Sequence, residues 1–223
     1  GRVAQTYQPD DVDGSLSAQT MAVQGPLARS VADVRLTMSA LNDFSPRDPA
    51  FVPGAPAATP PQRPLRVGLV RDFGVAPPTE AVSASLDQAA YWLQDLGYIV
   101  EEIELPVLAE AYRLWYLLVM EEFRLAMPMV EEVGDEGMKT AAAHYYAVAA
   151  DWWGDKPDLE TFIKGYSRRG TLIRQLSKIL EDHPIILLPV SAEQAFKQDE
   201  DIESVESTRR IMNAQASMMA VPV

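Results

Sequence analysis

Residues 66–105 show the strand, helix, strand pattern that places two strands side by side in a parallel sheet. Arg66–Val70 is short, apolar and β-branched, which is typical of a buried strand. A helical apolar period begins at about Thr79 and ends before Gly97, a residue suited to the left-handed position after a helix. A second strand is expected over Tyr98–Leu105. A crossover helix makes the two strands parallel with a right-handed connection, so we expect an α/β protein.

The segments before this unit are expected to be less regular. The opening stretch to about Gln24 is rich in turn residues and shows no sustained period. A helix is predicted from Val31 to Leu41, where apolar residues recur at helical spacing. Residues 45–64 contain seven prolines, which neither a helix nor a central strand tolerates. We expect that segment to be an extended crossing on the surface.

The segments after the unit are expected to be mainly helical. Aromatic residues concentrate there, and a third buried strand is bounded by two prolines. An acidic loop, interpreted as a solvated face, precedes the last helix. The predicted elements are helices over about 108–133 (interrupted by Pro128), 139–153 and 159–180, a strand over 184–189, and a helix from about Ser207.

Composition excludes several classes of function. Lys and Arg number 19 against 32 Asp and Glu, a net charge of −13, which argues against a nucleic-acid partner. The absence of cysteine excludes disulfides, Cys-ligated metals and a thiol nucleophile. With two distant histidines, we expect neither a metal nor a cofactor. No apolar run reaches the ~20 residues of a membrane span, and the first residues show no signal peptide, so no membrane partner and a cytoplasmic location are expected.

The chain carries no complete catalytic motif of its own. It has no nucleophile elbow, phosphate-binding loop, metalloprotease helix motif or dinucleotide fingerprint. The adjacent carboxylates Glu121–Glu122 and Glu131–Glu132 point to different helix faces, so neither pair forms one site. The residues alone therefore indicate an α/β protein without a self-contained active site.

Residues 25–33, Gly-Pro-Leu-Ala-Arg-Ser-Val-Ala-Asp, resemble the G-P-[ML]-[AT]-R-[ST]-V-x-D segment of the amidase signature family. Ser30 and Asp33 also have the spacing of a capping box at a helix start. Four further segments resemble the family in the same order: Gly1–Val3, Arg47–Pro49, Leu65–Glu102 and Ile186–Ser191. Arg47–Pro49 favours a general amidase over the tRNA-dependent amidotransferase subunit. Structural roles are assigned to Gly25, Pro26, Arg29, Ser30 and Asp33, with Arg29 expected to bridge loop carbonyls or a carboxylate.

The resemblance implies hydrolysis of carboxamide bonds by acyl transfer. The family uses a serine nucleophile, a second serine with a cis peptide bond, and a lysine base. These residues belong to a region that would precede Gly1, and a further family motif would follow Val223. The chain is thus expected to be an inactive internal segment that supplies scaffold and substrate selection. The rest of its own fold and a small-molecule amide are its expected partners, and a homo-oligomer is left open.

Two other functions stay open: a catalytically silent amidase-like binding or partner subunit, and an unrelated α/β binding module. The expected fold is a mixed sheet flanked by helices, amidase-signature-like but partial, with a helical substrate subdomain. Its parts are residues 1–64, the core segment and proline-rich crossing; 65–106, the βαβ unit; 107–182, the substrate-facing helices; and 183–223, the return strand and helix.

Substrate-binding residues are expected where the family varies most, in the helices between the βαβ unit and the third strand. Aromatic and methionine side chains supply the adaptable apolar walls that ligand pockets use. The alternative is that these side chains are ordinary core. The candidates are Trp115, Met120 and Tyr145 for an acyl pocket, Glu121 for a cationic or amide-bearing group, and Val190 and Ser191 in the loop after the third strand.

Overall fold

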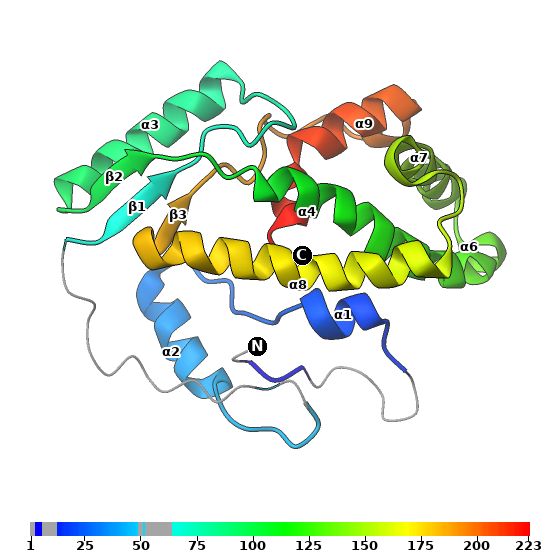
Figure 1. The fold of residues 1–223 in the computed structure, drawn as a ribbon, viewed down its shortest axis with the longest axis horizontal. Coiled ribbons are helices and arrows are strands. Elements are labelled where there is room, and N and C mark those ends of the chain that lie inside the picture. The colour runs from blue at the N-terminus through cyan, green and yellow to red at the C-terminus, as the bar shows by residue number, and fades with distance from the viewer. Residues whose placement is uncertain (1–2, 6–12, 49–50, 52–63) are drawn as a thin grey trace. The chain divides into compact units, whose positions relative to one another are not determined.

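In the computed structural model, the strand–helix–strand segment forms two neighbouring strands of a parallel sheet (Figure 1). The third predicted strand pairs with the other side of the first, giving the order β2-β1-β3. Val67 stands opposite both Val100 and Ile185, and all described strands run parallel. The expected α/β class is confirmed. The strands are β1 (Arg66–Leu69), β2 (Ile99–Glu102) and β3 (Ile185–Leu187).

The crossover helix α3 (Glu80–Asp95) packs on the sheet through its predicted apolar face. Leu86 and Ala90 are buried against Leu69 of β1. Thr79 caps the helix with its hydroxyl, and Gly97 follows it with a φ of 85°, a conformation that favours glycine. Strand β2 is shorter and more exposed than predicted, because it is an edge strand with a pairing partner on one side only.

The structure describes residues 3–5, 13–48, 51 and 64–223, and the chain divides into two units, 1–61 and 62–223. Most of the proline-rich crossing lies outside the described residues. The three further boundaries expected from the sequence all fall within the larger unit.

The helices of the larger unit cover the expected regions with different bounds. Pro128 does not interrupt them, because it lies in the first turn of α6, where its missing N–H is not needed. The elements are α4 (Val107–Trp115), the π-helical turn η1 (Tyr116–Met120), α5 (Glu121–Phe123), the 3-10 turn η2 (Arg124–Ala126), α6 (Met127–Val133), α7 (Glu136–Trp153), α8 (Leu159–Asp182), the 3-10 turn η3 (Glu200–Ile202), α9 (Val205–Ala214) and α10 (Ala216–Ala220).

The core of the larger unit centres on α4 and η1. Tyr112, Tyr116 and Leu118 are almost completely buried there. Helix α8 runs alongside α4 (Figure 1), and Gly165 permits the close approach. A Cβ at Gly165 would lie 2.8 Å from Leu117 Cδ2, closer than packed carbon atoms tolerate.

An ion pair joins the same two helices. Arg168 Nε and Nη2 donate to the two carboxylate oxygens of Glu110 at 2.6 and 2.7 Å. The hydrogen bonds from Arg168 lower the pKa of Glu110 below its ordinary value. Both side chains are more than a third exposed, so solvent screening limits the pair to about 1 kcal/mol or less.

Glu110→Gln is therefore expected to lower the free energy of unfolding by at most about 1 kcal/mol at neutral pH. A carboxylate with a lowered folded pKa stabilises the fold above its unfolded pKa and loses this effect as pH falls through the folded value. The difference from wild type should therefore shrink towards zero below about pH 4. Urea unfolding at a series of pH values measures it, with the exposed Glu132→Gln as control. A difference that grows on acidification would contradict the prediction.

The smaller unit contains α1 (Leu16–Met21) and α2 (Val31–Leu41). Helix α1 was not predicted from the sequence, because six residues are too few to show a helical period. Its N-terminus is capped by the Ser15 hydroxyl, which accepts the N–H of Ala18.

Helix α2 begins as predicted, with a modified capping box. The Ser30 hydroxyl accepts the Asp33 N–H at 3.1 Å and donates to the Asp33 carboxylate at 2.8 Å, so that carboxylate does not bond the cap backbone. Arg29 is exposed and has no hydrogen bond to a described residue, against the bridging role expected for it. Gly25 and Pro26 precede the helix in irregular backbone.

Candidate substrate-binding site

An apolar cavity of about 270 Å³ opens between two helical walls of the larger unit. One wall comes from the end of α4, η1 and α5, and the other from the first three turns of α7. Aromatic rings, methyl groups and thioethers line it, which suits an apolar ligand group. The lining residues are Trp115, Val119, Met120, Phe123, Met138, Ala141, Ala142 and Tyr145.

The three best sequence candidates meet in this cavity. Trp115 is partly exposed, and its ring contacts Tyr116 edge-on at 5.2 Å. Met120 is 4% exposed, so it belongs to the core and to the cavity wall at once. Tyr145 approaches from α7, and burial raises the pKa of its hydroxyl, which stays neutral at physiological pH.

Glu121 lies next to this wall but does not line the cavity. Its carboxylate accepts two hydrogen bonds from the guanidinium of Arg124, at 3.0 and 2.7 Å. The Arg124 Cζ atom also lies 4.3 Å from the centre of the Tyr146 ring. Glu121 thus has a structural partner and no contact with the cavity in which it was expected to bind substrate.

Val190 and Ser191 follow β3 and are not brought to the apolar cavity. Val190 is 73% exposed. The Ser191 hydroxyl donates to the Glu193 carbonyl at 2.8 Å and accepts the Glu193 N–H at 3.2 Å, which closes a turn. The Ser217 hydroxyl lies 2.8 Å from the Val190 carbonyl and ties this loop to α10.

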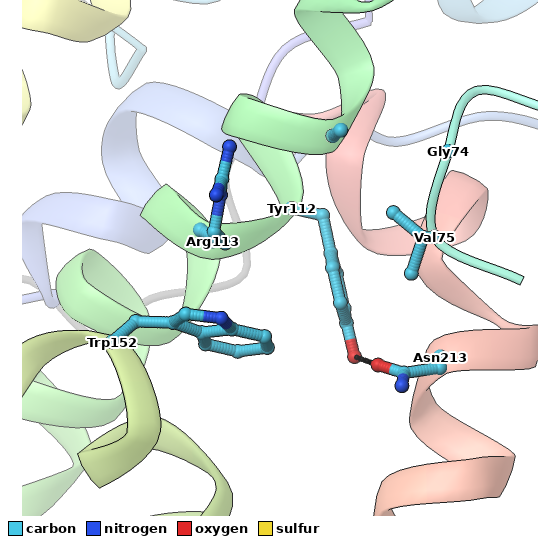
Figure 2. A pocket seen from close by; sticks show the side chains of 7 residues that line it. Gly74, Val75, Tyr112, Arg113, Trp152 and Asn213 are labelled. Carbon is cyan, nitrogen blue, oxygen red and sulfur yellow. Dashed lines mark hydrogen bonds between the residues drawn. The ribbon is translucent and has the colours of Figure 1, made fainter.

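A second pocket, of about 200 Å³, lies beside the loop that follows β1 (Figure 2). Its central side chain is Tyr112, whose hydroxyl donates to Asn213 Oδ1 of α9 at 3.0 Å. Figure 2 shows Trp152 and Val75 on opposite sides of the Tyr112 ring, and Arg113 pointing away from Asn213. Pockets of open parallel sheets commonly lie at the carboxyl ends of the strands, as this loop does.

Sequence reasoning missed this pocket. Tyr112 lies in the apolar period of α4, and Asn213 is 101 residues away in sequence, so no local signal pairs them. Burial raises the pKa of Tyr112 far above its ordinary value, and the group remains a neutral donor. Its hydrogen bond orients the Asn213 amide so that the NH₂ group points away from Tyr112 (Figure 2).

Two further observations limit the chemistry of the described residues. No three His, Asp or Glu side chains among them are placed to hold a metal ion. None of the described helices is long and apolar enough to cross a membrane.

The family model for amidases matches residues 14–223 of this chain. The chain belongs to the amidase family, and the resemblance to the amidase signature family is confirmed.

Two kinds of relative match most of the chain. An indoleacetamide hydrolase of Bradyrhizobium japonicum is 28% identical over 219 residues, covering 95% of this chain and 44% of the relative. A glutamyl-tRNA(Gln) amidotransferase subunit of Gluconobacter oxydans is 26% identical over 232 residues, covering 92% and 46%. The chain thus spans less than half the length of these relatives.

Solved structures of the family share the fold. Fatty acid amide hydrolase superposes with a TM-score of 0.65 at 20% identity, over 96% of this chain and 39% of that protein. A bacterial aryl acylamidase of the amidase signature family gives a TM-score of 0.60 at 18% identity, over 86% and 44%. The described helices and parallel sheet are therefore part of an amidase-signature α/β fold.

Proposed function

We propose that the protein containing this chain hydrolyses carboxamide bonds by acyl transfer. Membership of the amidase family supports the reaction class. The resemblance supports a serine nucleophile assisted by a second serine and a lysine, in which the lysine takes the nucleophile's proton through the bridging hydroxyl. We place these residues outside the chain. The chain itself then contributes scaffold and substrate selection, and is inactive alone.

The apolar cavity is proposed to receive the acyl group of the amide. The supporting observation is that Trp115, Met120 and Tyr145 line one cavity without a charged neighbour in its wall. An aromatic or alkyl acyl group would remove apolar surface from water there, at about 25 cal/mol per Å². The names of the relatives, which include an indoleacetamide hydrolase and an aryl acylamidase, agree with an aromatic group.

Kinetics on the full-length protein test this proposal. The substrates are acetamide, phenylacetamide and indole-3-acetamide, and the variants are Met120→Ala and Tyr145→Phe. A binding role predicts that Met120→Ala changes the order of the three substrates by kcat/KM, because the pocket changes shape. Tyr145→Phe should alter that order with a free energy of unfolding within about 0.5 kcal/mol of wild type.

Met129→Ala is the matched control, because Met129 is 60% exposed on the same helical segment. An equal loss on all three amides that follows lost stability would mean that Met120 and Tyr145 serve only as core. Absence of amide turnover by the full-length protein would reject hydrolysis itself.

The alternative is a catalytically silent amidase-like partner subunit. The relatives from the glutamyl-tRNA(Gln) amidotransferases favour it, since those proteins are subunits by name. Saturable binding of indole-3-acetamide by the full-length protein without turnover would support this alternative.

A further inference from the structure

The π-helical turn η1 decides which residues face the apolar cavity. In an α-helix, each residue is rotated by about 100°, so Met120 would lie about 140° around the axis from Trp115. A π turn has hydrogen bonds between residues five apart, which places such residues nearly above one another. Met120 can therefore share the cavity wall with Trp115 only while η1 is kept.

One hydrogen bond from the opposite helix holds the end of this turn. The Tyr146 hydroxyl of α7 donates to the Met120 carbonyl at 3.1 Å. This carbonyl lies at the junction between η1 and α5, where the regular i to i−4 pattern changes. A partly buried carbonyl needs a partner, and Tyr146 supplies it from outside the segment.

The Tyr146 ring is itself fixed by a cation. The Arg124 Cζ atom lies 4.3 Å from the ring centre, within the range of a cation–π contact. Arg124 is held by the two hydrogen bonds to Glu121 and by a third, from its Nη2 to the Asp155 carbonyl at 3.1 Å. The Glu121–Arg124 pair thus orients Tyr146, which gives the carboxylate of Glu121 a role outside the cavity.

We propose that Tyr146 is a positioning residue that holds η1 and so sets the shape of the apolar cavity. Its effect on substrate choice rests on the proposed acyl-binding function. The sequence neighbours Tyr145 and Tyr146 then divide two tasks: Tyr145 forms the wall, and Tyr146 fixes the opposite wall at Met120.

Tyr146→Phe removes the hydroxyl and keeps the ring under Arg124. The Met120 carbonyl then lacks its partner, and the turn can relax to α-helical spacing, which rotates Met120 away from Trp115. In the full-length protein, kcat/KM for indole-3-acetamide is expected to fall about tenfold, mainly through a higher KM, while acetamide stays within about twofold.

A readout independent of activity follows the turn directly. With ¹³C-methyl methionine labels, the Met120 methyl resonance, assigned by Met120→Leu, should shift in Tyr146→Phe, while the exposed Met129 methyl should not. Tyr166→Phe is the matched control, because the Tyr166 hydroxyl bonds Glu122 Oε1 of the same segment at 3.3 Å but not η1. It should leave the Met120 resonance and both kinetic values unchanged.

A Met120 resonance that stays in place in Tyr146→Phe would overturn the proposal. An equal loss of kcat/KM on indole-3-acetamide and acetamide would overturn its effect on selection. If the resonance shifts but no amide is hydrolysed by the wild-type protein, the positioning role stands and the proposed hydrolase function fails.

Discussion

Ala141→Phe is expected to lower kcat/KM for indole-3-acetamide about 100-fold and to leave acetamide within about threefold. Ala141 lines the apolar cavity from α7 and is partly exposed, so a larger side chain can enter the cavity without displacing packed neighbours. A phenyl ring there would occupy the space proposed for the aromatic acyl group. A 100-fold loss corresponds to about 2.7 kcal/mol of transition-state stabilisation. Steady-state kinetics of the full-length variant measures both substrates.

Ala143→Phe provides the control for this variant. Ala143 is exposed on the same helix two residues later and does not line the cavity. Both changes carry the same loss of helix propensity, roughly half a kcal/mol, so only their positions relative to the cavity differ. Equal losses in the two variants, or an equal loss on acetamide and indole-3-acetamide, would show that the cavity does not receive the acyl group.

Position along the chain and side-chain type predicted one wall of the candidate site better than the other. Trp115 and Met120 were singled out as large adaptable side chains in the helices before the third strand, and the structure places both in one wall with Phe123. The facing wall includes Ala141 and Ala142, whose small side chains carry no sequence signal. They line a cavity only because of what packs opposite them.

Charged and polar candidates were less predictable for a different reason. Glu121 looked available for substrate, although Arg124 three residues later was a visible partner on the same helix face. Ser191 looked like a loop donor, but its hydroxyl closes a local turn with Glu193. Such side chains have several possible partners, and the sequence does not rank a local partner against a distant one.

Regular elements of ordinary length followed their periodicity closely. Helices α3, α7 and α8 were predicted to within a few residues, because each shows several turns of apolar repeat. The segment 108–133 was predicted as helix, yet the π turn and the 3-10 turn within it were not. These turns change the helical phase without changing composition, so the apolar pattern alone gives the wrong face after Tyr116.

Two leucines of this segment give the largest expected contrast in stability. Leu118 and Leu125 are seven residues apart, and in an uninterrupted α-helix they would lie within about 20° of the same face. In the structure, Leu118 is 0% exposed and Leu125 is 84% exposed, because η1 and η2 intervene. Uniform helical phase would predict similar burial for both.

Leu118→Ala is therefore expected to lower the free energy of unfolding by about 3–5 kcal/mol, the range for a leucine truncated in a packed core. Part of this loss is the cavity left beside Gly165, where α8 approaches too closely to collapse much further. Leu125→Ala should change the free energy of unfolding by no more than about 0.5 kcal/mol, as for other exposed positions. Urea unfolding of the two variants of the full-length protein, monitored by circular dichroism, measures the difference. Similar losses in both would mean that the helix runs through residues 116–126 without a change of phase, and the cavity wall built on that change would have to be abandoned.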